Sequence, residues 1–234
     1  GINYEGTEYE LRGCINDVLS VEKRLKELNC FNNFTIITDE TNIKPTRDNI
    51  LKELRKLCSN AKSDETLFFH FSGHGTYTYD RNGDEKDKKD ECIVSIDGKV
   101  IVDDEIYNIL KLLPNNCNMI MIFDCCHSGT IADLKFSYIK NNRIPRINNR
   151  KDDIKANVIS ISGCRDNQTS ADAYIQQKFQ GAMTFAFLQY FSKTITIHQL
   201  LNKMRKILRE KRFPQYPILS CSKKISLTQK FIWN

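Results

Sequence analysis

Apolar stretches at strand or helix spacing alternate along this chain, separated by polar and glycine-bearing segments. Two stretches, 66–71 and 119–123, are almost continuously hydrophobic, as is typical of parallel strands buried on both faces. Apolar residues at helical spacing predict a helix over 14–28, and Thr46 is the expected N-cap of a helix over 47–58. Strands are also expected at 34–37, 92–96, 157–161 and 218–221, and helices at 103–113, 181–192 and 197–211. This alternation predicts an α/β domain with a mostly parallel central sheet.

A basic, Asn-rich stretch over 135–155 interrupts the alternation. It has little hydrophobic periodicity, which predicts a mobile surface loop. The loop would divide a single domain into a larger part, 1–134, and a smaller part, 156–234, that share one sheet. Its basic residues are Lys135, Lys140, Arg143, Arg146, Arg150 and Lys151.

Composition and charge narrow the classes of function. The first 134 residues carry 16 Lys/Arg and 24 Asp/Glu, a net charge of −8, and the rest carry 19 and 5, a net charge of +14. The basic residues of 200–212 alternate with apolar ones at helical spacing, which favours a solvated helix face over a nucleic-acid site. No apolar run approaches the ~20 residues that span a bilayer, so no membrane partner is expected. Nine scattered cysteines without a secretory signal favour free thiols and a cytoplasmic location.

Polar, glycine-bearing clusters follow directly after the two most hydrophobic strands. His74 lies in the cluster after the first strand, and Cys126 lies in the cluster after the second. The carboxyl ends of parallel strands meet at one edge of a sheet, so we expect the two side chains to lie together there. An imidazole beside a thiol activates it as a nucleophile, and the Gly75 and Cys126 amides could stabilise a developing oxyanion.

Five segments together resemble the catalytic core of a metacaspase, a member of the caspase-like cysteine peptidases. They are Gly1–Tyr4, Glu10–Val18, Phe71–Gly75, Asp124–Gly129 and Ser162–Ala171. The resemblance implies a three-layer α/β/α caspase-like sandwich and a cysteine endopeptidase with Cys126 as nucleophile and His74 as proton-transfer residue. It assigns His127 no catalytic role.

The resemblance further implies cleavage of protein substrates after Arg or Lys. Two carboxylates in a partly desolvated pocket favour a guanidinium or ammonium group. From the residues alone, Asp17 is equally an exposed helix position and Asp124 a loop cap. The residues that match the family's pocket for the basic side chain (S1) are Cys14, Asp17, Ser72 and Asp124.

Calcium is the cofactor that the resemblance implies, as an activator. Carboxylate oxygens from several segments suit this hard cation, although Asp103 is equally a helix N-cap. A basic loop is also what an Arg/Lys-specific peptidase would cut in itself, so we expect autoprocessing within 135–155. The family also implies a monomer. The matching calcium positions are Asp90, Asp103, Asp104 and Asp133.

Two alternatives stay open. A catalytically inactive relative would serve as a regulatory or binding protein, although both dyad residues are present. Redox sensing by the adjacent Cys125 and Cys126 is disfavoured because neighbouring cysteines form strained disulfides. The family's core also begins with a strand that leads into the Gly-Ile-Asn-Tyr motif, so a further strand is expected before Gly1.

Overall fold

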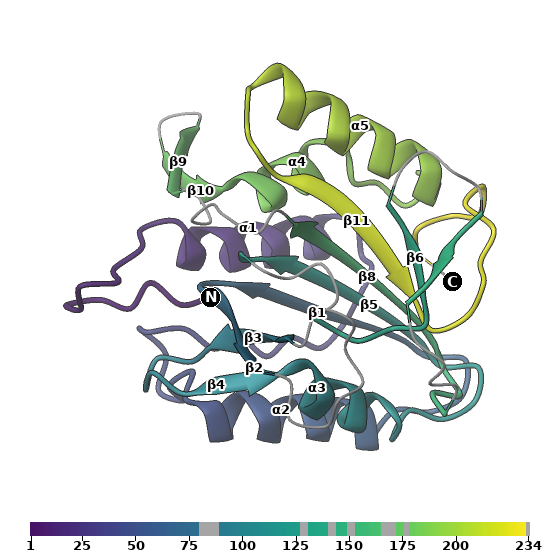
Figure 1. The fold of residues 1–234 in the computed structure, drawn as a ribbon, viewed down its shortest axis with the longest axis horizontal. Helices are drawn as coiled ribbons and strands as arrows, with labels where there is room; N and C mark the ends of the chain where they lie inside the picture. The colour runs from purple at the N-terminus through teal and green to yellow at the C-terminus, as the bar shows by residue number, and fades with distance from the viewer. Residues whose placement is uncertain are drawn as a thin grey trace.

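A six-stranded sheet in the order β1-β5-β8-β11-β6-β7 forms the centre of the molecule (Figure 1). The computed structural model describes residues 1–79, 89–126, 131–139, 144–148, 153–164, 172–175 and 178–232. β1, β5, β8 and β6 run in one direction and β11 and β7 in the other, which confirms a mostly parallel sheet. The strands are β1 (Thr66–Ser72), β5 (Asn118–Asp124), β6 (Phe136–Tyr138), β7 (Arg146–Ile147), β8 (Asn157–Cys164) and β11 (Tyr216–Cys221).

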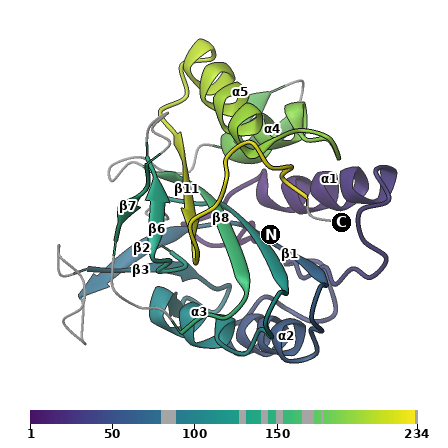
Figure 2. The ribbon, with the colours of Figure 1, turned by 90° about the vertical axis from the view of Figure 1, so that its right-hand side faces the viewer.

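Helices cover both faces of this sheet and complete three layers (Figures 1 and 2). α1, α4 and α5 pack on one face and α2 and α3 on the other, each group with its own apolar core. The residues of β5 between these cores are fully buried, as their continuous hydrophobicity predicts. The helices are α1 (Cys14–Glu27), α2 (Arg47–Ser59), α3 (Asp103–Leu110), α4 (Ala182–Tyr190) and α5 (Ile197–Glu210), close to the predicted ranges.

Two smaller β elements flank the sheet. One is a three-stranded antiparallel sheet, in which β2 follows β1 after a short turn and was not predicted from the sequence. The other is a hairpin that leads directly into α4. Their strands are β2 (Gly75–Tyr79), β3 (Lys89–Val94), β4 (Val100–Val102), β9 (Asp172–Ile175) and β10 (Lys178–Gly181).

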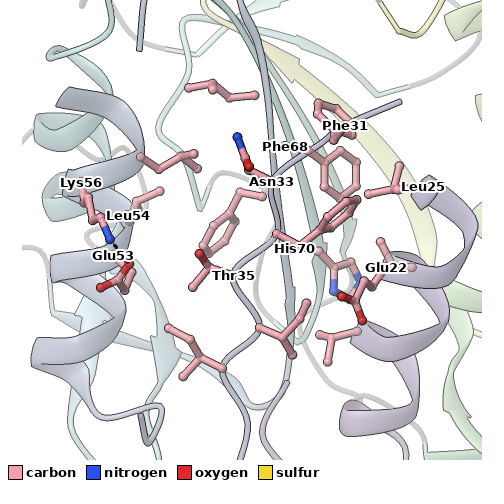
Figure 3. Close-up of a pocket in the computed structure, with 18 of the residues that line it drawn as sticks. Glu22, Leu25, Phe31, Asn33, Thr35, Glu53, Leu54, Lys56, Phe68 and His70 are labelled. Carbon is pink, nitrogen blue, oxygen red and sulfur yellow. Dashed lines mark ion pairs between the residues drawn. The ribbon is translucent and has the colours of Figure 1, made fainter. Parts of the chain in front are cut away.

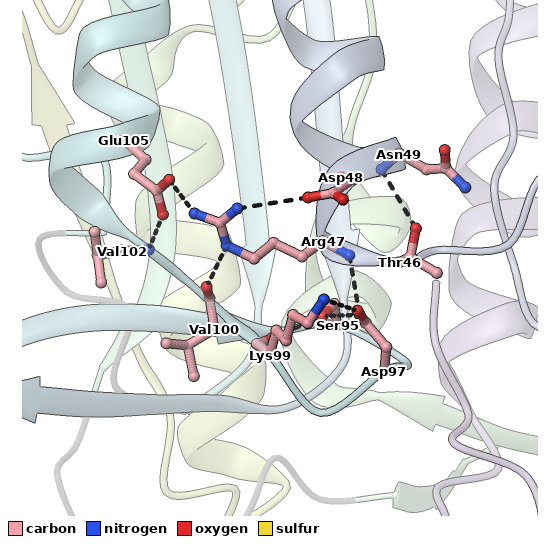
Figure 4. Close-up of polar contacts among 10 residues, drawn as sticks. All are labelled: Thr46, Arg47, Asp48, Asn49, Ser95, Asp97, Lys99, Val100, Val102 and Glu105. Atoms are coloured by element: carbon pink, nitrogen blue, oxygen red, sulfur yellow. Dashed lines mark hydrogen bonds and ion pairs between the residues drawn. The ribbon is translucent and has the colours of Figure 1, made fainter.

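The start of α2 is anchored by its cap and by its first residue (Figure 4). Thr46 Oγ1 accepts a hydrogen bond from the Asn49 amide at 3.4 Å, as predicted for the N-cap. The Arg47 guanidinium donates to the Val100 carbonyl at 3.1 Å and pairs with Glu105 of α3. One side chain therefore links α2 to both β4 and α3.

The predicted strand at 34–37 is wrong, because this segment is extended but pairs with no strand. A cavity of about 840 Å³ separates it from β1 (Figure 3). At one end of the cavity the Gly1 amine donates to the Ile37 carbonyl at 3.1 Å, and the Ile2 amide donates to the Ser72 carbonyl at 3.0 Å. The outer edge of β1 consequently faces a space with largely apolar walls, on the side where the family resemblance expects a further strand.

The prediction of an irregular loop over 135–155 is wrong for 136–138 and 146–147. The first of these is the buried strand β6, which pairs with β11, and the second is the edge strand β7. Phe136 and Tyr138 join the apolar core under α5. Three residues are too few to show a hydrophobic period, so the sequence gave no signal for this strand.

Candidate active site

The ends of β1 and β5 lie side by side and in register, with Ser72 opposite Asp124. His74 and Cys126 each lie two residues beyond this pair. Gly75 packs so closely on the next strand end that a Cβ would lie 1.9 Å from the Cys126 carbonyl oxygen. Only glycine fits there, and its absence of a side chain allows the His74 and Cys126 segments to meet.

Two tyrosines orient His74. Its amide donates to Tyr4 Oη at 2.9 Å, and the two rings lie 4.7 Å apart between centroids. Its Nε2 lies 2.7 Å from the Tyr9 carbonyl oxygen. A carbonyl can only accept a hydrogen bond, so Nε2 carries the proton and Nδ1 of the neutral ring holds the lone pair. This tautomer leaves Nδ1 as the atom that can take a proton from a nucleophile.

The two adjacent cysteines lie in different environments. Cys125 is buried in the apolar core beneath the sheet, whereas Cys126 is half-buried at the strand end. The eight cysteine side chains that the structure describes are all free thiols. The half-buried thiol is therefore the one that a substrate can reach.

Two carboxylates lie buried next to this strand end. Asp17 of α1 is 1% exposed and Asp124 is 2% exposed. Ser72 Oγ donates to Asp17 Oδ2 at 2.6 Å, and the Gly181 amide donates to both Asp17 oxygens at 3.0 Å. The Thr184 amide donates to Asp124 Oδ2 at 2.7 Å. Four segments, β1, β5, α1 and the β10–α4 junction, thus enclose two acidic groups.

Burial and mutual repulsion govern the ionisation of this pair. Burial, and then the charge of Asp124, raise the pKa of Asp17 well above its usual value. Burial also raises the pKa of Asp124. Cys14 lies beside them, and burial followed by the charge of Asp17 raises the pKa of its thiol. The structure therefore brings together all four residues predicted to line the pocket, in an environment that a cation would stabilise.

Gly181 and Thr184 belong to the same enclosure, and sequence reasoning missed both. A Cβ on Gly181 would lie 2.1 Å from Asp124 Oδ2 and 2.7 Å from Asp17 Oδ2. No motif surrounds either residue in the sequence, and they lie far from both aspartates along the chain. Only the packing of α4 against β5 brings them near.

Three of the four aspartates predicted to bind calcium are buried near one another. Asp103, the first residue of α3, accepts hydrogen bonds from the Glu91 amide at 3.0 Å and the Asp104 amide at 2.8 Å. Burial, and then the charges of Asp133 and Asp90, raise the pKa of Asp103 to about 8. Among the described residues, no three ligand side chains converge closely enough to hold a metal ion. The donor chemistry suits calcium, but these side chains do not form a finished coordination shell.

The basic residues predicted as autoprocessing sites are described in part. Lys135 is half-buried beside β6, and Arg146 is exposed in β7. Lys140, Arg143, Arg150 and Lys151 lie outside the described residues.

Comparison with known proteins identifies the family. The sequence profile of the metacaspase peptidase C14 domain matches residues 1–135, which include His74 and Cys126. The chain belongs to the metacaspase family. Metacaspase-3 of Trypanosoma brucei brucei is 38% identical over 99% of this chain and 72% of its own length. Metacaspase-1 of Schizosaccharomyces pombe is 36% identical over 95% of this chain and 66% of its own length.

A solved structure supports the fold. A protein from Geobacter sulfurreducens superposes with a TM-score of 0.71 at 23% identity, covering 98% of this chain and 95% of that one. The metacaspase chain thus has the caspase-like α/β fold, and its family membership makes it a cysteine peptidase that acts on proteins. No helix in the described part of the chain is long and apolar enough to cross a membrane.

Proposed function

We propose that this chain is a calcium-activated cysteine endopeptidase that cleaves proteins after Arg or Lys. The observation that carries the specificity is the buried pair Asp17 and Asp124, which lies beside the strand ends that bear His74 and Cys126. A guanidinium or ammonium group in this enclosure would neutralise two carboxylates that otherwise repel each other.

The geometry supports a two-step acyl transfer. His74 Nδ1 takes the proton of the Cys126 thiol, and the thiolate attacks the carbonyl carbon of the scissile bond. The carbonyl oxygen becomes an oxyanion beside the Gly75 and Cys126 amides. His74 returns the proton to the leaving amine as the C–N bond breaks, which leaves a thioester. A water molecule then attacks the thioester, His74 accepts its proton, and the acid and the thiol are released.

Peptide cleavage tests this proposal. Three fluorogenic peptides that differ only in Arg, citrulline or Asp before the scissile bond are compared in wild type and Cys126→Ala. Citrulline keeps the shape of Arg without its charge. We expect cleavage of the Arg peptide alone, and none in the variant. Equal cleavage of the citrulline peptide would remove the electrostatic specificity, and activity that survives in Cys126→Ala would remove the nucleophile.

Calcium activation is supported by the mutual repulsion of Asp90, Asp103 and Asp133. A divalent cation would relieve this repulsion, and these residues would supply some of its oxygen ligands. Calorimetric titration of calcium into wild type and Asp103→Asn tests it, with the exposed Asp48→Asn as the matched control. We expect binding to weaken in Asp103→Asn alone. Undetectable binding to wild type would remove calcium from the proposal.

Autoprocessing between 135 and 155 is supported by the exposed Arg146 in the two-residue edge strand β7. Such a short edge opens at little cost and presents an Arg to a second molecule. Intact mass after calcium addition, compared with Cys126→Ala, tests it. A wild-type chain that stays whole, or a Cys126-independent cut, would contradict it.

A monomer in the cytoplasm completes the proposal. The short basic edge β7 offers little backbone for pairing with a second sheet, and the described cysteines are reduced. Light scattering after size exclusion should give one species near 27.2 kDa. A dimer at micromolar concentration would overturn the monomer.

A further inference from the structure

The first histidine of β1, His70, lies away from the catalytic dyad and reaches the acidic pocket through one residue. Its side chain borders the cavity beside β1, together with Phe68 and Glu22 (Figure 3). Its Nε2 lies 3.0 Å from Oγ1 of Thr184, which is fully buried in the first turn of α4. Its Nδ1 is sealed from solvent and has no hydrogen-bond partner among the described residues.

Thr184 bonds Asp124 with both its backbone and its side chain. The amide donates at 2.7 Å to Oδ2, and the hydroxyl forms a second hydrogen bond with the same carboxylate. A hydroxyl has one proton, and a carboxylate can only accept. When that proton points at Asp124, the hydroxyl oxygen must accept from His70. Nε2 is then the protonated nitrogen of His70, and Nδ1 is the nitrogen that needs no acceptor.

The ring is also neutral, which the arrangement requires. Burial lowers the pKa of His70 to about 3, so at neutral pH the ring has a single N–H. A second N–H would be buried without an acceptor at Nδ1. The ring can therefore donate only at Nε2, toward Thr184.

We propose that His70 is a positioning residue for the acidic pocket: its Nε2–H holds the Thr184 hydroxyl so that the hydroxyl proton points at Asp124. This inference rests on the proposed function, because it assigns the residue to the recognition of Arg or Lys. Without the N–H, the hydroxyl is free to turn and Asp124 loses a donor that favours its charged form. Binding of a cationic side chain weakens, whereas the reaction at Cys126 and His74 does not change.

Kinetics on a pair of substitutions test the positioning role. His70→Phe keeps a ring but removes the N–H, and His70→Gln restores an N–H at the same distance along the side chain. We expect His70→Phe to raise KM for the Arg peptide by roughly tenfold, the effect of one hydrogen bond to a charged group. We expect kcat within about twofold of wild type, weaker discrimination against citrulline, and recovery of both in His70→Gln. His198→Phe is the matched control, because this histidine of α5 bonds only Asn202 among the contacts described.

Thr184→Val gives an independent variant, since valine keeps the shape and removes the hydroxyl. We expect the same rise in KM as in His70→Phe, and no further rise in the double variant, because both substitutions break one chain of hydrogen bonds. Full additivity of the two effects would contradict the chain.

The ring tautomer can be read without any activity. Nitrogen-15 spectra of histidine-labelled protein contain signals from four histidines, and the His70 signal is the one missing in His70→Gln. We expect a neutral Nε2–H ring from pH 5 to 8. An Nδ1–H ring or a charged ring would overturn the proposal, even if neither His70→Phe nor Thr184→Val folds.

The failures are distinguishable. A wild-type protein without Cys126-dependent cleavage of the Arg peptide overturns the proposed function. A wild type that cleaves this peptide, with unchanged KM and discrimination in folded His70→Phe and Thr184→Val, overturns the positioning role alone.

Discussion

Single atoms decide how the candidate site is held. The Tyr4 hydroxyl accepts the His74 amide at 2.9 Å and donates to the Val94 carbonyl at 2.7 Å, so one oxygen links three segments. The Gly-Ile-Asn-Tyr motif marked Tyr4 as part of a family pattern, but its role is visible only in the structure, because Val94 is 90 residues away.

Tyr4→Phe removes this link. Two buried backbone groups lose their partner, so we expect a loss of about 1–3 kcal/mol in the free energy of unfolding. His74 also loses a constraint, so kcat should fall several-fold with little change in KM. Urea denaturation and peptide kinetics measure the two effects, with Tyr79→Phe, whose side chain is 85% exposed, as control. Equal stability of the two variants would contradict the role of the hydroxyl.

Asp17→Asn should separate function from stability. The folded state holds the proton of Asp17 more tightly than the unfolded state does, so wild-type stability is lost as pH rises from the unfolded pKa, 3.8, through the raised folded pKa. The variant lacks this loss. We therefore expect it to be more stable than wild type by roughly 1 kcal/mol at pH 7 and equal near pH 3, with cleavage of the Arg peptide abolished.

Asp97→Asn is the matched control for that pH series. A hydrogen bond from Ser95 lowers the pKa of Asp97 to about 2, so this group has the opposite sign. Its stabilisation is present above pH 3.8 and is lost as pH falls toward 2. Thermal melts from pH 3 to 7 should therefore show opposite trends for the two variants. Parallel trends would contradict the repulsion between Asp17 and Asp124.

Helix and strand ends carry the structural signals that could be recognised in the sequence. Thr46 before a 13-residue amphipathic segment correctly marked the start of α2, because N-caps act locally. The strand predicted at 34–37 failed because strand pairing depends on a neighbour, and this segment faces a cavity instead. Arg47 was not singled out from the sequence, since its partners lie on other elements (Figure 4).

Thr46→Ala should lower the free energy of unfolding by about 1 kcal/mol through loss of the cap. The site is far away, so peptide cleavage should not change. Thr46→Ser keeps the acceptor oxygen and serves as control in the same urea titration. A serine variant as unstable as the alanine variant would assign the effect to the lost methyl group instead.

The junction of β10 and α4 should tolerate no side chain at Gly181. Its φ of −70° suits any residue, so the cost of Gly181→Ala is entirely the contact of the new methyl group with the two carboxylates. We expect cleavage of the Arg peptide to fall at least tenfold as Asp17 and Asp124 separate.

Gly98→Ala is the complementary control for that substitution. It has open space but a φ of +72°, so it should lose about 1 kcal/mol of stability and no activity. Equal activity of the two variants would show that the pocket adapts.

The charge of the whole molecule is arranged by its two parts. The front part, with net charge −8, contains both strand ends of the candidate site, and the rear part carries +14. An acidic surround raises the rate at which a basic substrate arrives, and salt screens it. Raising NaCl from about 20 to 200 mM, a range over which the Debye length falls roughly threefold, should therefore lower kcat/KM for the Arg peptide several-fold.

The uncharged citrulline peptide is the control for this salt series. Its inhibition of the Arg reaction should change much less with salt, because it lacks the charge that is steered. An equal response of both peptides would assign the effect to the protein's stability instead.

The amino-acid sequence by itself determined the fold class, the family and the residues proposed for the dyad. These depend on local pattern: hydrophobic strands end in polar glycine-bearing clusters, and parallel strands put such ends at one edge. Only the tertiary structure decided what encloses Asp17 and Asp124. Gly181, Thr184 and His70 reach them across 164, 60 and 114 residues of sequence separation. Contacts of that kind arise from the packing of α4 on the sheet, and no spacing within a single element encodes them.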